Sequence, residues 1–136
     1  MQVATVFVGD VRFTIEVAGT TTEQRIGLSG RDHLAAGTGM LFPQRSERIV
    51  SFWMRGMLIP LDFLWVGGDC RLRDVTLNVP PPDDPNQSVN LPIYSPSSPV
   101  LYVLEVNAGD VRASGIAIGD AVRFENTNVI PSVCGG

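Results

Sequence analysis

Lysine is absent from this 136-residue chain, and its ten basic residues are all arginines. The absence excludes Schiff-base chemistry on a lysine side chain, a phosphate-binding loop built around a lysine, and a lysine general base. Histidine occurs once, as His33, and cysteine twice, so the chain lacks the ligands of a typical structural zinc site. We therefore expect neither a bound metal nor a cofactor.

Long apolar runs and clusters of basic residues are also missing. No segment approaches the ~20 consecutive apolar residues of a membrane helix, and the first residues lack the basic and apolar regions of a signal peptide. The net charge of −4, without any basic run, argues against nucleic acid or an anionic membrane as a partner. The sequence leaves the compartment open: cytoplasmic, or exported with a signal already removed.

The two cysteines, Cys70 and Cys134, have no CxxC spacing. A disulfide between them is one alternative, because nothing in the sequence fixes the redox compartment. Cys134 lies in a glycine-rich tail, which favours two unbonded cysteines.

Alternating apolar residues predict a β-rich chain. Val11, Phe13, Ile15 and Val17 alternate with polar or small residues, as in a strand with one buried face. Thr20 and Glu23 match a capping box, which predicts a helix over residues 21–29. Further strands are expected over 37–42, 49–54, 61–66, 70–79, 100–106 and 116–124, with the strand over 61–66 central and a helical turn over 110–114.

Two irregularities interrupt this pattern. Within residues 70–79 the apolar residues occupy even positions at first (Cys70, Leu72) and odd positions later (Val75, Leu77, Val79). This change predicts a β-bulge near Asp74. Residues 80–99 hold seven of the ten prolines and are expected to form a long loop. The fold predicted for residues 1–126 is a single α+β domain, with a mostly antiparallel, barrel-like β-sheet and one short packed α-helix. Residues 127–136 are expected to be a flexible tail.

The segment 53–62 places polar residues within an otherwise apolar stretch. A core strand does not need Arg55, Pro60 or Asp62, and burying a charge is costly unless it is paired. This segment is therefore the best candidate for a built site. Trp53, next to Arg55, is a candidate surface platform, whereas Trp65 is expected to belong to the core.

Several short motifs together resemble a known family. The motifs are Gln24-Arg25-Ile26-Gly27-Leu28, Gly39-Met40-Leu41-Phe42, Trp53-Met54-Arg55, Ile59-Pro60-Leu61-Asp62, Val103-Leu104-Glu105-Val106 and Gly115-Ile116. In this order they resemble the bacterial and archaeal family catalogued as domain of unknown function 192. The resemblance implies a compact, mostly antiparallel β fold with a helix, and no established biochemical activity. The chain departs from the family pattern at Ser29, usually methionine, and at Gly56, usually a polar residue similar to asparagine.

Asp62 and Glu105 are the carboxylates in the most apolar surroundings. A pair of carboxylates at a suitable separation can act as general acid and base, which makes a hydrolase one alternative. The other interpretation is that arginines neutralise each carboxylate in a structural pair. His33 and the serines form no readable triad with an acidic residue, so we assign no catalytic residue.

The favoured function is a non-catalytic module that binds a small polar or anionic ligand, such as a carbohydrate or a peptide carboxylate. Arginine suits such ligands because its planar guanidinium binds carboxylates and phosphates through two hydrogen bonds. The candidate ligand-binding residues are Arg25, Arg31, Trp53, Arg55, Asp62 and Glu105. If Arg25 and Arg55 share one pocket, the helix must pack near Trp53, and the loop 80–99 is expected to cover the opening. A third alternative is an accessory domain whose sheet edge or loop 80–99 binds a protein partner.

Overall fold

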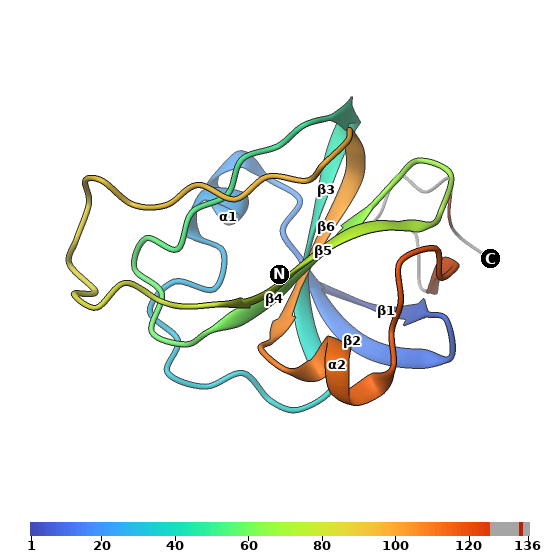
Figure 1. The fold of residues 1–136 in the computed structure, drawn as a ribbon, viewed down its shortest axis with the longest axis horizontal. Coiled ribbons are helices and arrows are strands. Elements are labelled where there is room, and N and C mark those ends of the chain that lie inside the picture. The colour runs from blue at the N-terminus through green and yellow to red at the C-terminus, as the bar shows by residue number, and fades with distance from the viewer. Residues whose placement is uncertain (126–133, 135–136) are drawn as a thin grey trace.

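A computed structural model describes residues 1–125 and 134, and in this part of the chain one seven-stranded sheet dominates (Figure 1). The strands are β1 (Gln2–Val8), β2 (Val11–Val17), β3 (Thr38–Arg48), β4 (Leu61–Val66), β5 (Leu72–Val79), β6 (Val100–Asn107) and β7 (Val122–Glu125). Two short helices accompany them, α1 (Thr21–Ile26) and α2 (Asp110–Ser114). The strand order across the sheet is β5-β4-β6-β3-β2-β1-β7.

The sheet is mostly antiparallel and curls into a half-barrel (Figure 1). The exception is the pair β2 and β3, which run parallel. Parallel neighbours need a crossover connection, and here the crossover contains α1. The fold is therefore α+β, as predicted, but with a mixed sheet and two helices instead of one. Both helices are short, and the described residues include no helix able to cross a membrane.

Most of the predicted elements are present. Strand β4 lies between β5 and β6 and is buried along its whole length, as expected of a central strand. The capping box is confirmed, because Thr20 Oγ1 accepts a hydrogen bond from Glu23 N and Glu23 Oε1 accepts one from Thr20 N, both at 3.1 Å. The predicted bulge is also present, because the β4–β5 register skips Arg73, next to Asp74.

The prediction of a strand over residues 49–54 is wrong. The segment pairs only through Phe52, which forms a single bridge with Tyr94 of the loop 80–99. A ladder needs a partner that donates repeatedly, and a loop rich in proline cannot supply one. The segment instead crosses the outer side of the sheet as an irregular chain, and this places its side chains in the candidate site.

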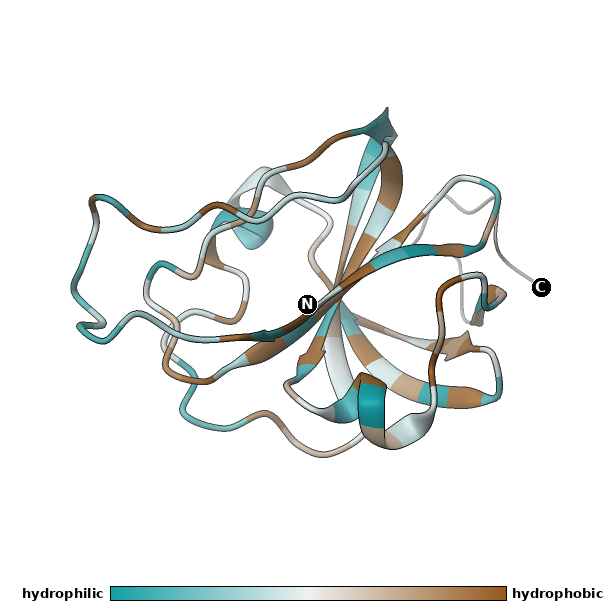
Figure 2. Cartoon of the chain, in the orientation of Figure 1, coloured by the Kyte–Doolittle hydropathy of each residue, from teal (hydrophilic) through white to brown (hydrophobic). Residues whose placement is uncertain are grey.

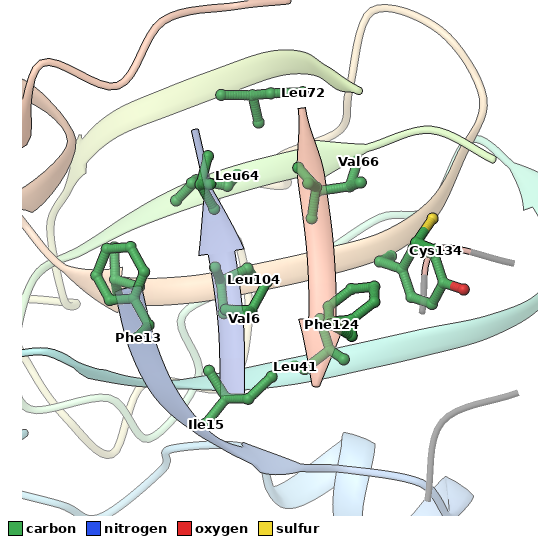
Figure 3. Packing of buried hydrophobic residues seen from close by; sticks show 14 of the residues in the cluster. Val6, Phe13, Ile15, Leu41, Leu64, Val66, Leu72, Leu104, Phe124 and Cys134 are labelled. Carbon is green, nitrogen blue, oxygen red and sulfur yellow. The ribbon is translucent and has the colours of Figure 1, made fainter. Parts of the chain in front are cut away.

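The inner face of the curled sheet holds one hydrophobic core. Figure 3 shows side chains from the strands that meet there, including Phe13, Leu41, Leu64 and Leu104. Val111 of α2 also belongs to this cluster. Apolar and polar colours alternate along β2 in Figure 2, because its apolar residues face this core and its polar residues face outward.

A second core covers the outer face of the sheet. Phe42, Phe63 and Trp65 of the strands meet residues from the connection between β2 and β3, such as Leu28, and from the segment 49–60, such as Met57. Since this face is covered by the α1 crossover and by irregular chain, the sheet has a core on both sides. Part of this outer core, including Leu28, Phe42 and Met57, forms the floor of a cavity.

Cys70 and Cys134 form a disulfide, so the expectation of two unbonded cysteines is wrong. The ends of the strand order meet near this bond, because Leu72 N donates to Asp120 O at 2.9 Å and Val122 N donates to Cys70 O at 2.8 Å. Proximity through the curled sheet, which cannot be read from sequence spacing, brings the two cysteines together. The predicted tail 127–136 lies outside the described residues except for Cys134.

Candidate functional site

Asp62 is completely buried and is held by backbone N–H groups. Its Oδ1 accepts a hydrogen bond from Asn78 N at 2.9 Å, and its Oδ2 accepts from Gly109 N at 3.0 Å and Val111 N at 3.1 Å. The carboxylate therefore ties β4 to β5 and to the start of α2. Its surroundings are those of a structural residue with no opening to solvent.

The hydrolase interpretation requires Asp62 and Glu105 to face each other, and they do not. Asp62 pairs with Val106 across β4 and β6, whereas Glu105 pairs with Phe63. Side chains alternate between faces along a strand, so Asp62 points to the inner face and Glu105 to the outer face. The two carboxylates cannot act on one substrate, and the predicted acid–base pair is wrong.

Arg31 is also separated from the other candidate arginines. Its guanidinium forms two hydrogen bonds with the Glu16 carboxylate, one of them at 3.0 Å. This pairing lowers the pKa of Glu16 and raises that of Arg31, chiefly through the hydrogen bonds between them. Arg31 is thus one partner of a local ion pair, and it does not line the cavity described next.

A cavity of about 260 Å³ lies on the outer side of the sheet and brings four of the candidate residues together. Its buried floor contains Leu28, Phe42, Val50, Met54, Met57 and Glu105. Its exposed rim contains Arg25, Ile26, Arg48, Ser51, Trp53 and Arg55. Arg25, Trp53, Arg55 and Glu105 were predicted from sequence, whereas Asp62 and Arg31 lie elsewhere.

Helix α1 is held beside the cavity by contacts at its start and at Gln24. The capping box fixes its start, and Gln24 Nε2 donates to Ala18 O at 3.0 Å and to Pro43 O at 2.8 Å. Gln24 therefore attaches the helix to the end of β2 and to β3. Arg25, the next residue, is held at the cavity rim by this attachment.

The segment 53–57 is fastened to the turn that follows α1. Ser29 Oγ donates to Arg55 O at 3.2 Å, and Gly30 N donates to Gly56 O at 2.9 Å. Gly56 has a φ of 72°, and a Cβ added there would lie 3.3 Å from Ser29 Cβ. Ser29 and Gly56 are the two departures from the family pattern, and they lie next to each other beside the cavity. The small size of each residue leaves room for the other.

The rim arginines have no acidic partner among residues 1–125 and 134. Neither Arg25, Arg48 nor Arg55 forms an ion pair with any residue in the described part of the chain. Arg55 lies over the Trp53 ring, 5.5 Å from the guanidinium carbon to the ring centroid, and Trp53 is 48% exposed. Three cationic groups around one opening create a positive potential that is not cancelled locally.

Glu105 is the only acidic residue among those that line the cavity. Its side chain is 5% exposed, between Met40 of β3 and Phe63 of β4, and it forms no hydrogen bond or ion pair with the described residues. Burial raises the pKa of Glu105 to about 8, because the apolar surroundings disfavour the charged form. At neutral pH the floor therefore holds a neutral carboxylic acid under a cationic rim.

Arg48 is the charged rim residue that the sequence did not predict. It ends β3 after a polar stretch, Gln44 to Glu47, that has the composition of an exposed turn. The pairing of β3 with β6 is irregular between Pro43 and Arg48. Arg48 follows this irregularity and lies at the cavity rim. No periodic signal in the sequence marks such an irregularity.

The proline-rich loop 80–99 does not cover the cavity, contrary to the prediction. None of its residues lines the opening. Tyr94 N and O bond to Phe52, and Ser95 Oγ lies 3.2 Å from Ser51 Oγ, so the loop supports the neighbouring segment from the side. Within residues 1–125 and 134, the structure also contains no group of three or more acidic, histidine or cysteine side chains placed to hold a metal ion.

Residues 4–124 match the family DUF192, a domain of unknown function described as "Uncharacterized ACR". The chain belongs to this family. Among the curated proteins none matches significantly. The fold is similar to that of a solved protein from Sinorhizobium meliloti 1021, described as a candidate transcription regulator, with a TM-score of 0.80, 30% identity, and coverage of 90% of this chain and 94% of that one. It is also similar to a protein of unknown function from Novosphingobium aromaticivorans DSM 12444, with a TM-score of 0.79, 33% identity, and coverage of 90% and 85%.

Proposed function

We propose that this DUF192 chain is a non-catalytic module that binds a small anionic ligand in the cavity between α1 and the segment 50–57. The observation that carries the proposal is the convergence of Arg25, Arg48 and Arg55, none paired with a described carboxylate, on one opening. A charged side chain that lacks an internal partner is available to a ligand, and guanidinium groups match carboxylates and phosphates in geometry.

The neutral floor supports the same proposal. An ionised Glu105 would oppose an anion held above it, whereas the protonated acid does not. Because burial keeps Glu105 protonated at neutral pH, the cavity has a net positive charge. Trp53 adds a flat apolar surface at the rim, which suits the body of a small organic ligand.

Among the described residues, no hydroxyl group that lines the cavity bonds to a catalytic base. Ser29 and Ser51 are the hydroxyl groups at its edge, and neither bonds to a histidine or a carboxylate in the described structure. His33, the one histidine, is exposed and does not line the cavity. These placements favour binding over nucleophilic catalysis, which needs a base within hydrogen-bond reach.

A thermal-shift screen tests the proposal, because a ligand of the folded state raises the melting temperature as its concentration exceeds its dissociation constant. The panel contains phosphate, benzoate, hexanoate, several amino acids and neutral sugars. We expect anions to stabilise the wild type and neutral sugars to have no effect. Replacing Arg25 and Arg55 by glutamine together should remove the shift.

A matched control uses Arg112 of α2, which is exposed and has no ion pair with the described residues. Because Arg112 does not line the cavity, Arg112→Gln should retain the full shift. Equal loss in the control and in the double variant, or stabilisation by neutral sugars alone, contradicts an anion site at this cavity.

The similar protein from Sinorhizobium meliloti is described as a candidate transcription regulator. A direct role in DNA binding requires basic residues spread along a surface to contact several phosphates. The net charge of −4 and the convergence of three arginines on one small cavity favour a small anion instead. We therefore propose no nucleic-acid partner.

A further inference from the structure

The floor of the cavity contains a polar side chain that no described protein group hydrogen-bonds, and this side chain constrains the ligand. Glu105 is 5% exposed, and its carboxyl group forms no hydrogen bond with the described residues. A buried polar group without a partner costs free energy, so native proteins almost always provide one. Both oxygens retain some access to the cavity, since the described structure has no fully enclosed side-chain oxygen without a partner.

The surroundings of Glu105 exclude an internal partner. Its neighbours across the sheet, Met40 and Phe63, are apolar, as is Val103 two positions earlier on β6. The charged groups that line the same cavity are Arg25, Arg48 and Arg55, and none is within ion-pair distance of Glu105. Water in the cavity can satisfy the carboxyl group, and a ligand that displaces this water must supply the same hydrogen bonds.

We propose that the ligand is a hydroxylated organic acid, whose anionic group binds the arginine rim and whose hydroxyl group, at the opposite end, binds Glu105. This inference rests on the proposed function and specifies its ligand class. The apolar floor residues Phe42, Met54 and Met57 would contact the body between the two polar ends. A cavity of about 260 Å³ has room for a small organic acid.

A hydroxyl group fits this floor better than an ammonium group. A protonated carboxyl donates one hydrogen bond and accepts others, and a hydroxyl group does the same, so the two match without a charge. An ammonium group would have to pass three guanidinium groups and would place a charged pair in an apolar floor, where desolvation opposes it.

The test compares acids that differ at one end only, by isothermal titration calorimetry below the pKa of Glu105. The two series are benzoate, 4-hydroxybenzoate and 4-(aminomethyl)benzoate, and hexanoate with 6-hydroxyhexanoate. In at least one series we expect the hydroxylated acid to bind about five- to tenfold more tightly than its parent, the usual gain from one buried hydrogen bond. Glu105→Gln, which keeps a donor and an acceptor, should retain the preference, and Glu105→Met should abolish it.

The outcomes separate this inference from the proposed function. Equal binding of each parent acid and its hydroxylated form, tighter binding of the ammonium acid, or a preference that survives Glu105→Met overturns the inference but leaves the anion site standing. Binding of phosphate but of no organic acid would also overturn the inference and leave the anion site standing. Failure of every anion to bind contradicts both proposals.

Discussion

Asp62 and Glu105 lie on adjacent strands one residue out of register, and their carboxyl groups therefore point to opposite faces of the same sheet. Asp62 accepts three backbone hydrogen bonds on the inner side, whereas Glu105 has no described partner and opens on the cavity of the outer side. Two carboxylates that look equivalent in the sequence thus have different surroundings: one links three segments of the fold, and the other lines the cavity.

Replacing Asp62 should destabilise the protein strongly. Asp62→Ala leaves the N–H groups of Asn78, Gly109 and Val111 without acceptors in a buried region, at a cost on the order of 3 kcal/mol. Asp62→Asn, which keeps one acceptor oxygen, should cost less. Urea unfolding measures both, and a loss below ~0.5 kcal/mol for the alanine variant would contradict a structural role.

Glu105 should make stability depend on pH. Its folded pKa of about 8 exceeds the ordinary value of 4.5, so folding takes up a proton between these two values. The free energy of unfolding should therefore fall as pH rises through this window, by at most ~1.4 kcal/mol per pH unit, and level off above it. Glu105→Gln should lose this slope. Parallel pH profiles for wild type and variant would show that Glu105 does not titrate in this range.

The same protonation should control ligand affinity. Above the folded pKa of Glu105, about 8, the floor gains a negative charge under the bound anion. Arg25, Arg48 and Arg55 stay charged throughout, so the affinity for benzoate should decrease as pH rises through that value. Calorimetric titrations across this range measure the effect, and Glu105→Gln should bind with constant affinity. An affinity that rises with pH in the wild type contradicts the assignment.

Gly39 should resist substitution because β3 and β6 approach closely there. A Cβ added at Gly39 would lie 2.5 Å from Glu105 O, a backbone atom that cannot move without shifting β6. Gly39→Ala should therefore cost about 2–3 kcal/mol in unfolding experiments. Gly19 is a suitable control, since an added Cβ there meets nothing within 4 Å. Similar stability of the two variants would refute the steric explanation.

The disulfide should contribute to stability through the loop it closes. Cys70 and Cys134 are 64 positions apart, and loops of this size give roughly 2–4 kcal/mol. Replacing both cysteines by alanine should lower the free energy of unfolding by this amount, whereas adding a reductant to that variant should have no further effect. An unchanged stability in the double variant would show that the bond does not constrain the unfolded chain.

The sequence predicted the elements better than their partners. Strand β4, the capping box at Thr20 and the bulge beside Asp74 all depend on local spacing, and each is present. The register between β4 and β6, strands whose paired residues are about forty positions apart, depends on tertiary packing. The sequence shows which residues of a strand share a face. It does not show which face of the sheet those residues occupy.

The candidate site shows the same division. Trp53 and Arg55 stand out locally, because polar and aromatic residues interrupt an apolar stretch. Arg31 looked equivalent to Arg25, but Glu16, fifteen residues earlier, binds it instead. Arg48 reaches the cavity only through the irregular end of β3, and no sequence rule predicts its position.

The affinity of the cavity for an anion tests the central claim most directly. Isothermal titration calorimetry compares the wild type, Arg25→Gln/Arg55→Gln and the control Arg112→Gln, with the acid that stabilises the wild type most. Loss of two charge-assisted hydrogen bonds should raise the dissociation constant of the double variant on the order of 100-fold, with Arg112→Gln unchanged. An unchanged dissociation constant in a folded double variant would contradict an anion site at Arg25 and Arg55.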